Sequence, residues 1–560
     1  MIPTKGKPTI FLWLIILICI QTTAMFLFCT EKDGFHLDEG FTLAINGDID
    51  DGEGNIFYYY STVTDEWKNP SSFSYYYSVS DENRFNYSSV YQETILDGVH
   101  PPLYYFVLFT LESLLPTAVT KWYGLIINLL FFVATLIVLW CIGIRLFNNA
   151  YFALAPLFLY GFSFGAVNTV IYIRMYAMVS FFIVAFLLAL FLLIIDKPKL
   201  HIYAILAFVG FCGVMTHYYF ILFAVPVVLI YIVWLALQKR WKLLFSVVAA
   251  GVCAVAAMLI AHPSFWWQMT GSYRSVEALA SLSASHSDAK FIAYFEIFCS
   301  SIINVTFGTA PIAVIIGAVA FILIVFLWSK LRRDKRNSDS FRVFLHPKKV
   351  LLNPRRFFCG LLIVSSGFYI ILITSIAPYW EDRYLMMLFP ILSLLIAALY
   401  YAVAKRFRLP VFALPAATVV FLIIVGISYI GFEENYLYKL HKQSPEIRDL
   451  REQMRDVPAV ATVLEETHWE LHTLLPELIL YKPNAPVYIN NFSDIGSYPD
   501  ELYRIIAQAR QLSQNGKVML FIEHSHFDVA LIAEQLVMNE PFTSFRYLYS
   551  VMLWDVYIVS

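Results

Sequence analysis

The chain has 560 residues, of which 59% are hydrophobic and 14% charged, and its mean hydropathy is +0.66. Because about a quarter of the residues of a soluble protein are charged, this composition excludes a soluble globular protein and indicates a polytopic membrane protein with the lipid bilayer as a partner. The formal net charge of −2 gives no indication of nucleic-acid binding.

The first apolar run, over 9–28, follows Lys5 and Lys7 and resembles a secretory signal peptide at first sight. No small-residue cleavage site follows it, and the run is long enough to cross a bilayer. We therefore expect a retained first transmembrane helix.

Apolar runs of roughly 18 or more residues predict about eleven crossings, which makes residues 1–431 a polytopic α-helical membrane domain. The expected helices lie near 9–30, 120–146, 150–169, 175–195, 200–217, 218–237, 242–262, 298–328, 357–378, 384–404 and 410–431. A shorter run, 101–115, begins with two prolines and carries Glu112, so we interpret it as a helix at the membrane interface.

Lysine and arginine in short loops concentrate on the cytoplasmic side of membrane proteins. With 101–115 left out of the count, all the basic segments fall on one side. They are Lys5 and Lys7, Arg145, Lys197 and Lys199, 239–242, 330–356 and 405–408. Counting 101–115 as a crossing would move Arg145 and 239–242 outside, so the charge rule rejects that count. We expect a cytoplasmic N-terminus in a protein of the cell membrane.

The same topology places a second set of polar segments on the outer face. They are Asp38-Glu39, a long first loop over 46–98, 173–176, 216–219, 263–297 and 379–384. The tyrosine tracts 57–60 and 75–77 of the first loop are expected to form strands or a cover over this face. Aromatic residues also gather at membrane interfaces as plain anchors, and that alternative stays open.

Residues 432–560 have the composition of a soluble domain. Apolar runs at 460–464, 487–489, 518–522 and 545–559 predict strands, and 468–480, 499–514 and 527–538 predict helices. Strands that alternate with helices indicate a small α/β domain. An odd number of crossings puts this domain outside the cytoplasm.

The doublet Asp38-Glu39 follows the first crossing, where ionised groups near hydrocarbon are costly and tend to serve a task. A carboxylate in a partly dry cleft can take the proton from an attacking hydroxyl group. The alternative is that Asp38 caps the next helix, because aspartate is a favoured N-cap residue.

Other polar residues of the outer face also have two interpretations. Arg174 and Arg383 offer permanent donors suited to phosphate, or they contact lipid headgroups or neighbouring carboxylates. His100 and His217 can line the same cleft, or they are satisfied residues at helix ends.

Five motifs in order resemble the GT-C superfamily of membrane glycosyltransferases. They are Phe35-His36-Leu37-Asp38-Glu39-Gly40, His100-Pro101-Pro102-Leu103-Tyr104-Tyr105, Arg174-Met175-Tyr176-Ala177, Thr216-His217-Tyr218 and Asp382-Arg383-Tyr384-Leu385. The resemblance is to the bacterial branch that includes protein O-mannosyltransferases and lipid A aminoarabinose transferases (glycosyltransferase family 39-like), and it covers about 9–404. It implies an inverting transferase that moves a sugar from a polyprenyl-phosphate donor to an acceptor hydroxyl at the outer face.

The resemblance also implies roles for residues. Asp38 is expected as the catalytic base and Glu39 as the neighbour that orients the base or the acceptor. The residues expected to bind the donor and its phosphate are His100, Arg174, Tyr176, His217, Tyr218, Arg383 and Tyr384. Some relatives bind a divalent metal, but no third ligand is evident near Asp38, so no metal or other cofactor is predicted. The acceptor, whether glycan, lipid or protein, is not indicated.

The competing hypothesis is a transporter or a flippase for lipid-linked glycans. It predicts charged residues deep within crossings and discontinuous helices. The predicted crossings are almost purely apolar at their centres, which favours the enzyme.

Overall fold

The computed structural model of the protein describes residues 7–47, 63–116, 119–196, 198–284, 288–307, 353–378, 381–407, 445–492, 498–524, 526–538 and 542–560. The predicted crossing at 410–431, most of the one at 298–328, the tyrosine tract 57–60 and the boundary at 431/432 lie outside these ranges.

Seven helices in the described ranges are long and apolar enough to cross a membrane, so the chain is a multi-pass α-helical membrane protein. They are α1 (Lys7–Glu31), α6 (Trp122–Phe147), α9 (Tyr176–Ile195), α11 (Tyr219–Leu237), α12 (Trp241–Ala261), α19 (Pro354–Ile376) and the segment formed by η2 (Asp382–Leu388) with α20 (Phe389–Phe407). α10 (Leu200–Thr216), where another crossing was expected, has 17 residues and is about 26 Å long at 1.5 Å per residue.

The crossing expected as one helix over 150–169 is broken. α7 (Leu154–Gly161) and α8 (Phe164–Ile171) meet at an angle of 63°. Ser163 caps α8, because its hydroxyl accepts a hydrogen bond from the amide of Ala166 at 3.2 Å. A hydropathy run cannot register this break, since both halves are apolar.

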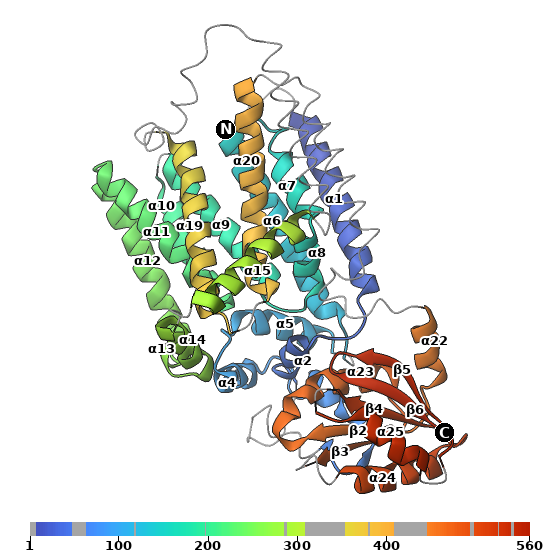
Figure 1. Cartoon of the computed structure of the whole chain (residues 1–560). Helices are drawn as coiled ribbons and strands as arrows, with labels where there is room; N and C mark the ends of the chain where they lie inside the picture. The colour runs from blue at the N-terminus through green and yellow to red at the C-terminus, as the bar shows by residue number, and fades with distance from the viewer. Residues whose placement is uncertain are drawn as a thin grey trace.

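Short helices cover one end of the bundle (Figure 1). They are α2 (Leu37–Ala44), α4 (Tyr87–Asp97), α5 (Leu103–Leu114), α13 (Phe265–Thr270) and α14 (Tyr273–Ala284). α5 is the helix expected at the interface, and its 12 residues are too few to cross a bilayer. Its buried Glu112 accepts a hydrogen bond from Asn46 at 2.9 Å.

Basic residues gather at the other end of the bundle. Lys405 and Arg406 lie in the last turn of α20, far from the C-terminal domain in Figure 1. Arg355, in the first turn of α19, donates a hydrogen bond from Nε to the carbonyl oxygen of Arg145, in the last turn of α6. These charges therefore share one end.

The C-terminal domain is an α/β unit built on a six-stranded sheet of order β1-β3-β2-β4-β6-β5. Its strands are β2 (Ala459–Leu464), β3 (Val487–Phe492), β4 (Val518–Glu523), β5 (Phe545–Val551) and β6 (Trp554–Val559), and its helices are α22 (Pro445–Gln453), α23 (Leu471–Tyr481), α24 (Tyr498–Leu512) and α25 (Val529–Met538). β2 lies parallel to β3 and to β4, while β6 is antiparallel to β4 and β5. The prediction of one strand over 545–559 is wrong, because the chain turns at Met552 and forms a hairpin.

The first outer loop joins this domain. β1 (Trp67–Lys68) pairs antiparallel with β3 at the edge of the sheet. The tyrosine tract 75–77 forms no strand; it ends the 3₁₀ helix η1 (Pro70–Tyr77), which packs against α2 and α23. The loop therefore fills the space between the bundle and the C-terminal domain.

A buried ion-pair group fastens the domain to the end of α1. Arg451 pairs with Asp33 at 3.2 Å and with Glu477 at 2.7 Å, and Tyr481 donates a hydrogen bond to Asp33. The side chains of Arg451 and Glu477 are each only 3% exposed. Removing one partner from such a group leaves a buried charge uncompensated.

We expect Arg451→Gln to weaken this attachment by about 3–5 kcal/mol. The change should lower the thermal unfolding temperature in detergent and speed proteolytic release of the C-terminal domain. Arg455→Gln is the matched control, because Arg455 is 46% exposed and its pair with Glu452 contributes at most about 1 kcal/mol. Equal behaviour of the two variants would contradict the assigned role.

Candidate active site

α2 begins with a capping box that leaves Asp38 free for other contacts. His36 is the N-cap, and its Nδ1 accepts a hydrogen bond from the amide of Asp38 at 3.2 Å. Glu39 Oε2 accepts from the amide of His36 at 2.7 Å, which closes the box. The alternative that Asp38 caps the helix is therefore wrong.

Glu39 is fully buried and held from three sides. Lys32 Nζ lies 2.9 Å from Oε2, and the amide of Ile173 donates to Oε1 at 2.6 Å, besides the amide of His36. These donors come from the end of α1, the start of α2 and the loop before α9. These contacts hold α2 in place, and the expectation that Glu39 orients the base stays a prediction.

Asp38 is partly exposed, at 24% of its side chain, and faces two arginines. Its Oδ2 accepts a hydrogen bond from the hydroxyl of Tyr172 at 2.5 Å and forms an ion pair with Nη1 of Arg383. Burial alone raises the pKa of Asp38, but the guanidinium groups of Arg383 and Arg174 outweigh it and hold the pKa well below its usual range. The carboxylate is therefore ionised at neutral pH.

Arg174 is buried, and hydrogen bonds hold its guanidinium group in one orientation. Nη1 donates to the carbonyl oxygen of Asp38 at 3.0 Å and to the hydroxyl of Thr42 at 2.7 Å, and Nη2 donates to His100 Nε2 at 2.7 Å. A guanidinium cannot accept a hydrogen bond, so Nε2 of His100 is the acceptor and its proton lies on Nδ1.

Asp97 fixes that tautomer. Its Oδ2 accepts from His100 Nδ1 at 2.8 Å and from the amide of His100 at 2.9 Å. Burial favours a higher pKa for Asp97, but the contacts with His100 prevail and lower it. Asp97, His100 and Arg174 form a chain in which each group orients the next.

Aromatic rings line the region beside Asp38. Tyr176 stacks on Tyr172, with ring centroids 5.7 Å apart, and contacts the ring of His217 at 5.4 Å. Arg383 lies over the ring of Tyr384 at 5.4 Å. The tyrosine rings offer flat apolar faces with a polar hydroxyl at one edge.

The structure thus brings most of the residues singled out from the sequence into one network or beside it. Tyr218 is the exception, since its hydroxyl contacts His262 Nε2 at 3.1 Å and also Gln268, in a neighbouring polar group. Sequence reasoning missed Tyr172 and Lys32 as site residues. Lys32 carried a signal, because a lysine at the end of the first crossing that was predicted to face outside departs from the charge rule.

A metal ion at Asp38 would have to displace Arg383 and Tyr172, which both bind Oδ2, while the ring of His36 lies 3.9 Å from that atom. The expectation of no metal at Asp38 stays a prediction. Among the described residues, three side chains that offer metal ligands come together only in the C-terminal domain.

α2 also touches the C-terminal domain, through Gly40. A Cβ atom at Gly40 would clash with the backbone oxygen of His472, in the first turn of α23. The ring of His472 packs on Phe41 at 4.3 Å and accepts or donates a hydrogen bond with Tyr77 at 3.0 Å. Only glycine allows this approach.

We expect Gly40→Ala to force α2 and α23 apart and to cost about 1–3 kcal/mol, the usual range for overpacking. The thermal unfolding temperature in detergent should fall. Gly360→Ala is the control, because nothing lies within 4 Å of a Cβ at Gly360 in α19. A loss of stability that is equal in both variants would show that the close approach is not the cause.

The solved structures that are similar to this chain include two states of one protein. ArnT from Cupriavidus metallidurans bound to undecaprenyl phosphate has 11% sequence identity and a TM-score of 0.45, over 98% of this chain and 98% of that chain. The apo state of the same protein has 12% identity and a TM-score of 0.45, over 98% and 97%. No protein-family model matches the sequence, and no curated protein matches it. These values assign no role to any residue of this chain.

Proposed function

We propose that the protein is a GT-C-type membrane glycosyltransferase, which transfers a sugar from a polyprenyl-phosphate donor to an acceptor hydroxyl. The observation that carries the proposal is the partly exposed Asp38 carboxylate, paired with Arg383 at one end of a membrane bundle, while Arg174 donates to the backbone carbonyl oxygen of the same residue. Glycosyl transfer from such a donor needs a base for the acceptor and fixed cations for the departing phosphate, and this arrangement supplies both.

The reaction follows from the contacts of Asp38. Phosphate oxygens of the donor compete with Asp38 for the N–H groups of Arg383, so donor binding weakens the ion pair and raises the pKa of Asp38. The freed carboxylate takes the proton of the acceptor hydroxyl while its oxygen attacks the anomeric carbon. The bond from that carbon to the phosphate oxygen breaks with inversion, and polyprenyl phosphate leaves with the extra negative charge.

Arg174 acts beside Arg383 on the phosphate. The hydrogen bonds between Asp97 and His100 and between His100 and Arg174 keep the Arg174 guanidinium in place. The group therefore need not reorient as negative charge develops on the departing phosphate. Tyr176, His217 and Tyr384 form the wall for the donor. Tyr218 lies apart from this wall, because its hydroxyl contacts His262 and Gln268.

In this proposal, the distribution of basic residues decides which end of the helix bundle faces the cytoplasm. The basic end of the bundle, with Arg145, Arg355 and Lys405, is the cytoplasmic side. The site and the C-terminal domain then face the outside of the cell membrane, where nucleotide sugars are absent and a lipid-linked donor is required. The N-terminus is cytoplasmic.

One observation favours the transporter hypothesis, namely the 63° break between α7 and α8. Discontinuous helices in transporters expose backbone groups to a substrate. Here every residue of α8 is buried, and Ser163 satisfies the amide of Ala166 at its start. The break therefore has a local structural cause.

We expect Asp38→Asn to lower release of polyprenyl phosphate from a polyprenyl-phosphate sugar by at least about 100-fold, the usual contribution of a general base. Purified protein in detergent, a panel of donors and chromatography of the lipid product measure this. Asp196→Asn is the control, because Asp196 is an exposed residue just after α9. Full release by the Asp38 variant would remove Asp38 from catalysis, and lipid movement without release in the parent would favour a transporter.

Tyr172→Phe should move the acid limb of the pH–rate profile to higher pH. The Tyr172 hydroxyl stabilises the ionised form of Asp38, so its loss raises the pKa of Asp38, by about one unit for a hydrogen bond to a charged group. The maximal rate of donor cleavage at saturating donor tests the shift, because donor phosphate then competes for Arg383 and has already raised the pKa of Asp38. The profile is measured from the lowest pH at which the protein stays folded up to pH 8. Tyr231→Phe, a buried change in α11, should leave the limb in place.

A further inference from the structure

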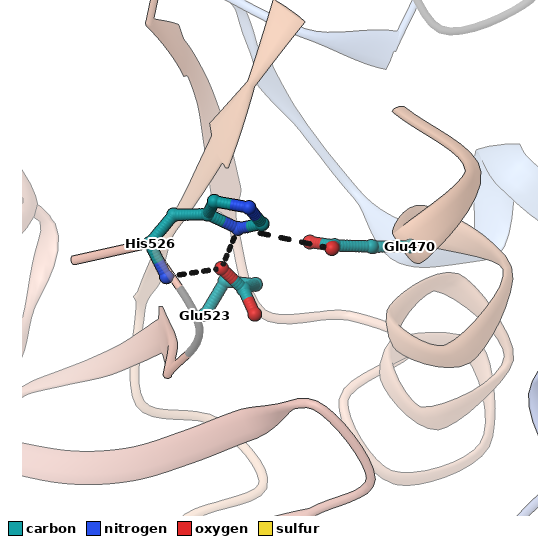
Figure 2. A group of neighbouring side chains, drawn as sticks. All are labelled: Glu470, Glu523 and His526. Atoms are coloured by element: carbon teal, nitrogen blue, oxygen red, sulfur yellow. Dashed lines mark hydrogen bonds and ion pairs between the residues drawn. The ribbon is translucent and has the colours of Figure 1, made fainter. Parts of the chain in front are cut away.

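A cluster of metal-ligating side chains lies in the C-terminal domain, away from Asp38. Figure 2 shows the side chains of Glu470, Glu523 and His526 pointing toward one another. Their ligand atoms all lie within 4.8 Å of one another. We propose that these three residues bind one divalent transition-metal ion, with Zn²⁺ the best match.

The topology of the sheet brings the ligands together. Glu523 is the last residue of β4, and Glu470 ends η4 (Glu465–Glu470), which follows β2 directly. β2 and β4 are parallel neighbours, so both residues lie at the carboxyl edge of the sheet. This edge is where ligand sites form in open α/β sheets, because the loops that leave parallel strands converge there.

The distances suit a zinc ion after small movements. His526 Nδ1 lies 2.6 Å from Glu523 Oε2 and 3.9 Å from Glu470 Oε1. Zinc bonds of about 2.1 Å at tetrahedral angles separate two ligand atoms by about 3.4 Å. The distance from His526 to Glu523 therefore has to lengthen and the distance from His526 to Glu470 has to shorten, each by less than about 1 Å. A rotation of the His526 ring can produce both changes.

The charges also match a divalent cation. The side chains of Glu470 and Glu523 are 2% and 1% exposed, and two carboxylates buried this close together repel each other. A divalent ion placed between the ligand atoms would attract both carboxylates. The side chain of His526 is 33% exposed, which leaves the ion a path from solvent.

The ion has a structural consequence for the membrane side of the protein. Glu470 immediately precedes α23, the helix whose first turn packs on α2. A metal that ties Glu470 to the loop after β4 holds the start of α23 on the sheet. Zinc binding should therefore stabilise the domain without taking part in chemistry at Asp38.

The test is zinc content and zinc-dependent stability of the full-length protein. Purified protein is stripped with chelator, given Zn²⁺, desalted and analysed by elemental mass spectrometry, and its unfolding temperature is recorded with Zn²⁺ and with chelator. We expect about one zinc per chain, a higher unfolding temperature with Zn²⁺, and a loss of affinity of at least about 10-fold in His526→Asn and Glu470→Gln.

His524→Asn is the matched control, because His524 is an exposed histidine in the same loop. If the Glu470 variant fails to fold, the comparison of His526→Asn with His524→Asn decides, since His526 is partly exposed. Equal zinc retention in those two variants, no retention in the parent, or stabilisation by Mg²⁺ alone would each overturn the proposal. Asp38→Asn should retain zinc, so this result is independent of the proposed transferase activity.

Discussion

The position of α2, and of everything it carries, depends on one buried carboxylate. Glu39 is taken fully out of water, which is tolerable only because Lys32 and the amides of His36 and Ile173 all bind it. These donors belong to three separate segments, so one side chain fixes α1, α2 and the loop before α9 against one another. Asp38 is the next residue, and its contacts with Arg174 and Arg383 follow from that arrangement.

The charges around Asp38 balance in a way that suits an anionic ligand. Asp38 occupies donor groups of Arg383 that a phosphate would also take, while Arg174 is kept in place by His100 and Asp97. In the proposed reaction, competition for the Arg383 guanidinium would therefore link donor binding to the basicity of the carboxylate. A permanent pair of cations without Asp38 would bind phosphate but would supply no base.

The sequence predicts well the features that depend on composition, such as the apolar helices. It predicts poorly the places where the backbone bends or turns. Long apolar runs such as 120–146 become helices because no other structure satisfies the backbone in lipid, and the α/β pattern of the C-terminal domain is likewise confirmed. The apolar runs continue through the break before Ser163 and through the hairpin turn at Met552. Hydropathy therefore gives no sign of either. The charge rule and the resemblance predicted that Asp38 and Arg383 lie on the same face. The proximity of Glu470 and Glu523 depends on the order of the strands in the sheet, and the spacing of residues along the chain does not reveal that order.

The two faces of α2 connect stability with the proposed chemistry. One face presents Asp38 to the arginines, and Gly40 on the same short helix admits the backbone of His472 from the C-terminal domain. α2 has eight residues, so a shift imposed at Gly40 moves Asp38 as well, because a helix this short moves as one body. The C-terminal domain, held to α1 through Arg451 and Asp33, thus acts as a fixed support against which the carboxylate is positioned. Changes far from Asp38, at Arg451 or at Glu470, should therefore reach the contact between Asp38 and Arg383 through the placement of α23 and α2.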